Sequence, residues 1–133
     1  WGDSKWAEFY IYDLYTALGM DQAAKRVYRQ FTANRDDFPR RGTHWFRDWF
    51  YPLWRDCGQA AVMDRFFRQL AEHFPREQDG TYTRRMNWGE YLHFTSGAAG
   101  ADLSRFADRA FGWPREWSDQ LEQARAQFPG VTY

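Results

Sequence analysis

The fold is decided by residues 4–31, which read SKWAEFYIYDLYTALGMDQAAKRVYRQF. Apolar side chains recur at intervals of three and four residues over 4–18 and again over 21–31. That spacing follows one face of a helix and does not fit the two-residue alternation of a strand. Gly19 stands where a helix ends, and Asp21 is expected to cap the next helix. Because about two residues join them, the two helices are expected to form an antiparallel hairpin in an all-α fold.

Each predicted helix carries a recurring set of side chains that the spacing assigns to one side. In the first helix these residues are Trp6, Phe9, Tyr10, Asp13, Leu14, Ala17 and Leu18. In the second helix they are Ala24, Val27, Tyr28 and Phe31. We expect both sets to face a common core.

The rest of the chain keeps the helical period, with a brief strand pairing expected only at Tyr82. Thr43 is expected to cap an aromatic segment over 45–54, in which Pro52 predicts a kink or a break. Further helices are predicted over 59–74 and from three starting points, at Asn87 and Asp102 as caps and at Pro114 as the first helical residue. The inward face of 59–74 is predicted to consist of Met63, Phe66, Phe67, Leu70 and Phe74. The sequence therefore predicts a compact all-α bundle of six or seven short helices in one domain covering 1–133.

The clearest local signature lies at the start of the fifth predicted helix. Asn87 and Glu90 are three residues apart, as in a capping box in which asparagine replaces serine or threonine. Such a pair satisfies backbone N–H groups that would otherwise lack partners at the helix start. We therefore expect a helix that begins directly after Asn87.

Composition excludes several classes of protein. The 133 residues suit a single domain, and 44% hydrophobic with 27% charged residues does not fit a disordered chain. Lysine and arginine together number 18, as do aspartate and glutamate, so no overall charge favours nucleic acid as a partner. No apolar run approaches the ~20 residues of a membrane span. Cys57 is the only cysteine, which excludes an internal disulfide and a four-cysteine zinc site.

Motifs for catalysis are incomplete in this sequence. It contains no His-Glu-x-x-His, no Gly-x-Ser-x-Gly, no phosphate-binding loop and no dinucleotide fingerprint, so no catalytic residue is predicted. Glu90 and His93 are spaced to share one helix face, as ligands do in di-iron bundles. Such bundles need a second pair and further glutamates. The alternative is that Glu90 caps its helix and His93 makes an ordinary polar contact, so no metal or cofactor is predicted for this chain.

Aromatic residues make up 21% of the chain, including eight tryptophans. Tryptophans either fill a dense core or present flat faces to a sugar or a partner. The candidates for ligand or partner contact are Trp45, Trp49, Trp54, Trp88 and Trp113. The competing interpretation is that short helices need large side chains to bury enough apolar area, in their own core or against a neighbouring domain.

The C-terminal third resembles the closing helices of enhancin-like, gluzincin-type zinc metallopeptidases. The resemblance is carried by three stretches, Asn87–Phe94, Ala98–Leu103 and Phe111–Pro114. They match a helix, an Ala-Ala-Gly-x-Asp-Leu turn and a short helix ending in a Gly-Trp-Pro step. The opening hairpin from Phe9 to Phe31, with its Leu18-Gly19-Met20 turn, is similar to the helix pair that precedes this region in the family.

The resemblance implies that this chain is the helical C-terminal part of a larger, secreted or periplasmic protein in which zinc is bound elsewhere. The family's His-Glu-x-x-His is absent here, so its two histidine ligands and its catalytic glutamate have no counterparts. Glu8 lies on a predicted helix, as a third ligand of the family does, but nothing is carried over to it without the other ligands.

The expected function is that of a non-catalytic accessory domain that walls or stabilises a substrate cleft. Its partners would be a neighbouring catalytic domain and a protein or glycoprotein substrate. The alternative is a self-sufficient, aromatic-rich module that binds a glycan or another ligand. These two functions differ in whether the tryptophans contact a partner domain or a small ligand.

Overall fold

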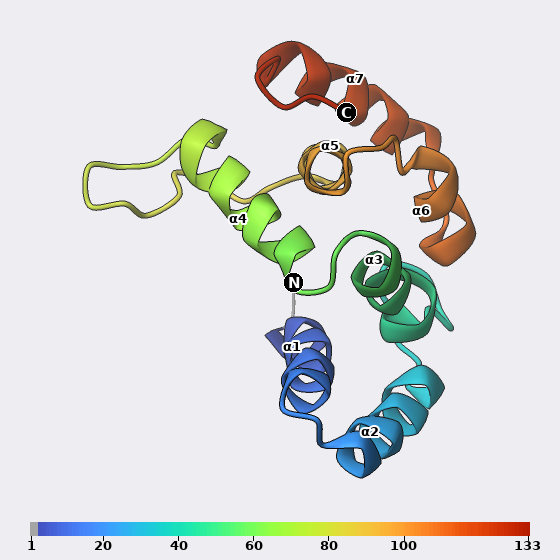
Figure 1. Cartoon of the computed structure of the whole chain (residues 1–133). Coiled ribbons are helices and arrows are strands. Elements are labelled where there is room, and N and C mark those ends of the chain that lie inside the picture. The colour runs from blue at the N-terminus through green and yellow to red at the C-terminus, as the bar shows by residue number, and fades with distance from the viewer. Residues whose placement is uncertain (1–2) are drawn as a thin grey trace. The chain divides into compact units, whose positions relative to one another are not determined.

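The computed structural model describes residues 3–133 and confirms the predicted all-α fold (Figure 1). The helices are α1 (Asp3–Ala17), α2 (Asp21–Ala33), α3 (Tyr51–Asp56), α4 (Ala61–His73), α5 (Trp88–Ala99), α6 (Ser104–Phe111) and α7 (Arg115–Gln127), and a π-helical segment η1 (Phe46–Phe50) leads into α3. Within the described residues, β pairing is limited to the isolated bridges Asp36–Thr43 and Arg76–Tyr82, of which the second was expected.

The chain divides into two compact units, each with its own internal packing. The N-terminal unit comprises residues up to Ala61 together with 106–112, and the C-terminal unit comprises 62–105 and 113–133. The expectation of a single domain over 1–133 stays a prediction.

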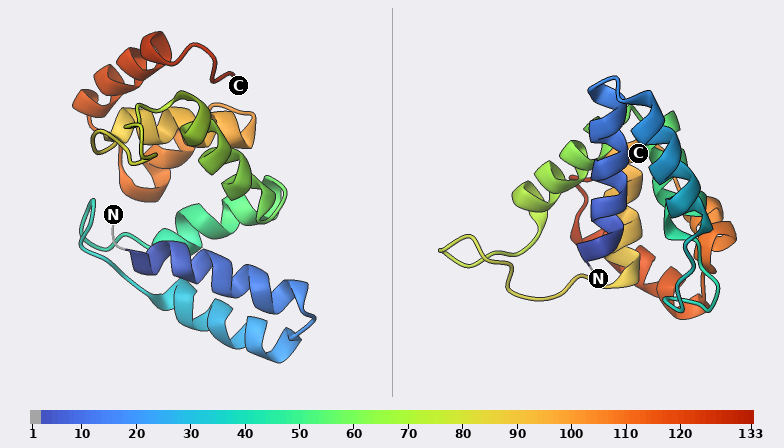
Figure 2. Two further views of the ribbon diagram at one scale, coloured as in Figure 1. Left: turned by 90° about the vertical axis from the view of Figure 1, so that its left-hand side faces the viewer. Right: turned by 90° about the horizontal axis from the view of Figure 1, so that it is seen from below.

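The hairpin of α1 and α2 forms as predicted, with the two helices side by side (Figure 2). Gly19 adopts a φ of +67°, the left-handed conformation that glycine adopts at low cost after a helix. The prediction that Asp21 caps α2 is wrong, because Asp21 is already the first helical residue. The residue before it, Met20, offers no side-chain cap.

Of the kink or break predicted at Pro52, the break is wrong, because the helical path continues from η1 through α3. The irregularity is instead taken up one turn earlier. The Tyr51 N–H donates to the Phe46 carbonyl oxygen, five residues back, so the turn before the proline is widened to a π-helix. A wider turn accommodates a residue that lacks an N–H and crowds the preceding carbonyl.

Aromatic rings fill the interior of the N-terminal unit. Trp49 is fully buried, stacks on Phe106 at a centroid distance of 4.9 Å and meets the edge of Phe111 at 5.1 Å. The Trp45 indole N–H donates to the Phe38 carbonyl oxygen at 2.8 Å, so its one polar group is satisfied inside the core.

In the C-terminal unit, α5 packs against α7 and starts with the predicted capping box. The Glu90 N–H donates to the Asn87 side chain at 2.8 Å, and the Asn87 N–H donates back to the Glu90 carboxylate at 2.9 Å. Gly100 ends the helix in the left-handed conformation. The prediction that Phe67 faces inward is wrong, because this residue of α4 is 43% exposed.

Candidate functional site

One side of α1 exposes a continuous set of apolar side chains, which we call the α1 stripe. The stripe consists of Ala7, Tyr10, Ile11, Leu14, Ala17 and Leu18. The 3.6-residue helical period places these six positions on one face, with no charged residue among them. Leu14 is 53% exposed and Leu18 is 64% exposed, so the stripe is a surface and not the edge of the core. The expectation that Tyr10, Leu14 and Leu18 face the core is therefore wrong.

The opposite face of α1 packs inward. Phe9 is buried against Phe50 with ring centroids 6.2 Å apart, and the Asp13 carboxylate accepts the indole N–H of Trp54 at 2.7 Å. Helix α1 thus buries aromatic and polar side chains on one face and exposes apolar side chains on the other. An apolar helix face is normally buried against another element. By contrast, α2 exposes polar or charged side chains at Asp21, Gln22, Lys25, Arg26, Arg29 and Gln30.

Glu8 is a buried carboxylate on α1 with only one of its oxygens engaged. Its Oε1 accepts the Asn34 amide at 2.7 Å and lies 3.4 Å from the Lys5 ammonium. Its Oε2 has no hydrogen-bond partner among the residues that the structure describes. Burial works to lower the pKa of Lys5, but its hydrogen bond to Asp36 and the charges of Glu8 and Asp36 outweigh burial and raise it. Lys5 therefore stays positively charged beside Glu8.

Glu90 and His93 lie on α5, but each is engaged by other protein groups. The Glu90 carboxylate accepts hydrogen bonds from both terminal nitrogens of Arg84, at 2.9 and 2.6 Å. The same carboxylate closes the capping box. The His93 ring lies between the Phe128 carbonyl oxygen and the Tyr133 hydroxyl, each at 3.1 Å. Within residues 3–133, no group of three or more histidine, cysteine, aspartate or glutamate side chains is arranged to hold a metal ion.

The surroundings of His93 fix which nitrogen carries its proton. A carbonyl oxygen only accepts, so Nε2 donates to Phe128 and Nδ1 accepts the hydroxyl proton of Tyr133. The Arg125 Nε donates to that same hydroxyl oxygen at 3.1 Å. Burial lowers the pKa of His93, the hydrogen bond to the Phe128 carbonyl opposes this, and the charge of Arg125 lowers it further. The folded chain therefore holds this imidazole neutral.

Stability is expected to decrease as the pH falls below about 6.5, the ordinary pKa of histidine. The unfolded chain takes up a proton there while folded His93 does not, so the unfolded state binds more protons and gains in relative free energy. The contribution of neutral His93 to the free energy of unfolding is complete above the ordinary histidine pKa and is lost as the pH falls below it. Urea unfolding at several pH values measures it. His93→Gln should flatten this part of the profile, and a profile that is unchanged in His93→Gln would contradict the assignment.

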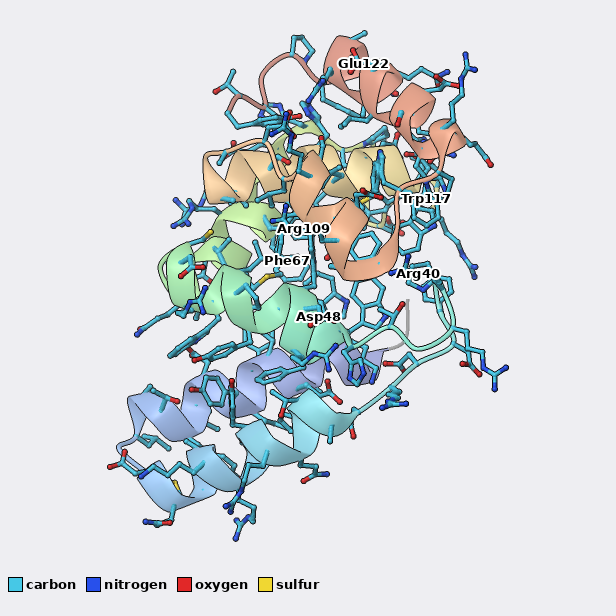
Figure 3. The ribbon with its side chains drawn as sticks, turned by 90° about the vertical axis from the view of Figure 1, so that its right-hand side faces the viewer. Arg40, Asp48, Phe67, Arg109, Trp117 and Glu122 are labelled. Atoms are coloured by element: carbon cyan, nitrogen blue, oxygen red, sulfur yellow. The ribbon has the colours of Figure 1, made fainter. Side chains whose placement is uncertain are left out.

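The tryptophan candidates divide into two groups. Trp45, Trp49 and Trp54 are buried, with exposed fractions of 4%, 0% and 9%, so they belong to the core. Trp88 and Trp113 are half-buried, and their ring centroids lie 4.5 and 5.4 Å from that of Trp117. Trp117 lies on α7 and is labelled in Figure 3. The five candidates therefore do not form one aromatic surface. Sequence spacing alone does not separate a buried tryptophan from an exposed one.

None of the described helices combines the length and the hydropathy required to cross a bilayer. Comparison of the chain with known proteins found no matching family model, no matching curated protein and no matching solved structure.

Proposed function

We propose that this chain is a non-catalytic helical accessory domain that docks, through the α1 stripe, onto a neighbouring domain of the same protein. The observation that carries the proposal is the exposure of an apolar face on a helix whose other face is already buried. Contiguous apolar patches of more than a few hundred Å² are uncommon on monomers and usually mark contact surfaces. Burying one leucine side chain contributes about 1.5–3 kcal/mol, so Leu14 and Leu18 would anchor the contact.

The chemistry of the stripe indicates what kind of surface would cover it. The stripe has no charged side chain, so it offers an approaching partner neither an ion pair nor a like charge to avoid. Its complement is an apolar surface, such as the outer face of another helix. The neighbouring catalytic domain implied by the resemblance to gluzincin-type metallopeptidases is our proposed source of that surface.

The same resemblance implies zinc, and the described residues do not fit a zinc site. A catalytic zinc site takes three protein ligands, and no such set lies within residues 3–133. Glu8 does not suit a ligand shared with another domain, because its carboxylate is buried, lies outside the α1 stripe and is engaged through Oε1 by Asn34 and Lys5. We therefore propose that the neighbouring domain supplies all the zinc ligands and the catalytic groups.

The docking surface is tested on the chain alone. The chain is expected to bind a hydrophobic dye or to self-associate in sedimentation experiments, because the α1 stripe is exposed. Replacing Leu14 and Leu18 with glutamate should abolish both effects while leaving the helical circular dichroism spectrum unchanged, because both side chains are exposed. Gln22→Glu with Gln30→Glu, on the polar face of α2, is the matched control. A monomeric wild-type chain that binds no dye would contradict the proposal.

The metallopeptidase part of the proposal has separate tests. The coding sequence that precedes Trp1 is expected to contain a His-Glu-x-x-His motif. After dialysis against a weak chelator, the chain alone should retain no stoichiometric zinc, since no set of three ligands lies within residues 3–133. One tightly held zinc per chain would contradict the proposal that the neighbouring domain supplies the ligands. Saturable tryptophan quenching by an oligosaccharide, without dye binding, would instead favour the glycan-binding alternative.

A further inference from the structure

A groove with tyrosine walls lies between α1, α2 and α3 in the N-terminal unit, and we call it the tyrosine groove. It has a volume of about 530 Å³, which lies within the range of small-molecule sites. Its lining consists of Tyr12, Thr16, Asp21, Ala24, Lys25, Tyr28, Arg29 and Tyr51. These residues do not belong to the α1 stripe, so the groove is independent of the proposed docking surface.

Three half-buried phenol rings form the apolar part of the groove. Tyr28 and Tyr51 meet edge to face with centroids 4.8 Å apart, and Tyr12 lies 5.6 Å from Tyr51 and 5.9 Å from Tyr28. Trp54 stacks behind Tyr51 at 6.1 Å. Because each ring is held by at least two others, the aromatic wall is preorganised and would lose little side-chain freedom when a flat ligand stacks on it.

The groove also carries positive charge and neutral hydrogen-bond donors. Lys25 and Arg29 are exposed, stand one turn apart on α2, and form no ion pair within the part of the chain that the structure describes. Burial raises the pKa of Tyr12 and the Tyr51 phenol acts in the same direction, so Tyr12 remains a protonated donor at neutral pH. Asp21 is the only acidic residue among the lining side chains.

We propose that the tyrosine groove binds a small aromatic carboxylate. Its ring would stack on the phenol rings, and its carboxylate would accept hydrogen bonds from Lys25 and Arg29. A neutral ligand would leave the two cations without a partner, and a cationic ligand would be repelled by them. The ligand class thus follows from the combination of an aromatic wall with a net positive charge, since Lys25 and Arg29 outnumber Asp21 in the lining.

Benzoate is the probe, and benzyl alcohol is its neutral counterpart. Titrations followed by NMR of the tyrosine rings are expected to show saturable benzoate binding that is at least tenfold tighter than binding of benzyl alcohol and that weakens with added salt. Acetate, which carries the charge without the ring, should bind at least tenfold more weakly than benzoate. If acetate binds as well as benzoate, the groove holds an adventitious ion only, and the proposal is overturned.

Variants assign the binding to these residues. The pair Lys25→Gln and Arg29→Gln should reduce benzoate affinity at least tenfold, to the level of benzyl alcohol. Arg26→Gln is the matched control, because Arg26 is exposed on the same helix but does not line the groove. All three positions are exposed, so circular dichroism should show an unchanged fold. Unchanged affinity in the pair, or an equal loss in the control, would overturn the proposal.

Discussion

Gly89→Ala is expected to destabilise the chain by about 3 kcal/mol, at the upper end of the usual cost of overpacking. A Cβ at position 89 would lie 2.2 Å from the carbonyl carbon of Gln120 and 2.2 Å from the amide nitrogen of Leu121. These are backbone atoms of α7, so relief requires movement of the whole helix. Alanine gains about 1 kcal/mol of helix propensity over glycine, which does not offset the clash. Urea unfolding followed by circular dichroism measures the difference.

Gly97→Ala is the graded control in the same helix. Its added Cβ would meet the Val131 methyl group at 2.4 Å and the Gln69 side-chain amide at 2.8 Å. Side chains shift more readily than a helix backbone, and the gain in helix propensity is the same. Gly97→Ala should therefore cost less than Gly89→Ala. Equal effects, or an unchanged midpoint for Gly89→Ala, would show that α5 and α7 are not in backbone contact at Gly89.

Features set by neighbours in sequence were predictable, because a few adjacent residues determine them. The capping box of Asn87 and Glu90 is one such case, since its two hydrogen bonds join residues three apart. The hairpin is another, because a glycine between two helical patterns ends the first helix and leaves only a short turn before the second. The structural use of Glu90 also agrees with the interpretation that it caps a helix.

Features set by tertiary packing were not predictable from spacing. Helix α1 has apolar residues on two faces, and periodicity alone does not say which face is buried: Phe9 is, whereas Leu14 is not. Which oxygen of Glu8 is engaged is set by the Asn34 amide, which donates to Oε1 from a distant position in the sequence. The tyrosine groove likewise joins residues from three helices. A signal was present in α1, whose apolar positions are more numerous than one buried face requires.

Arg84→Ala is expected to cost about 2–3 kcal/mol, because it leaves the Glu90 carboxylate buried without its cation. The Glu90 side chain is 3% exposed, and the two nitrogens of Arg84 that reach it form a bidentate pair. Breaking a fully buried pair costs about 3–5 kcal/mol, and we expect less here because the Arg84 side chain is 40% exposed. Lost packing adds to the effect, since the guanidinium lies 4.8 Å from the Phe74 ring centroid.

A double-mutant cycle separates the unpaired charge from the lost packing. Adding Glu90→Gln to Arg84→Ala should recover part of the stability, because a neutral amide is less costly to bury and its oxygen still accepts the Asn87 N–H. Asn87→Ala alone, which removes a cap but leaves the ion pair, should cost about 0.5–2 kcal/mol. Glu122→Ala, which removes an exposed partner of Arg125, should cost at most about 0.5 kcal/mol. If the double variant is less stable than Arg84→Ala alone, the charge of Glu90 is not the source of the loss, and packing against Phe74 is.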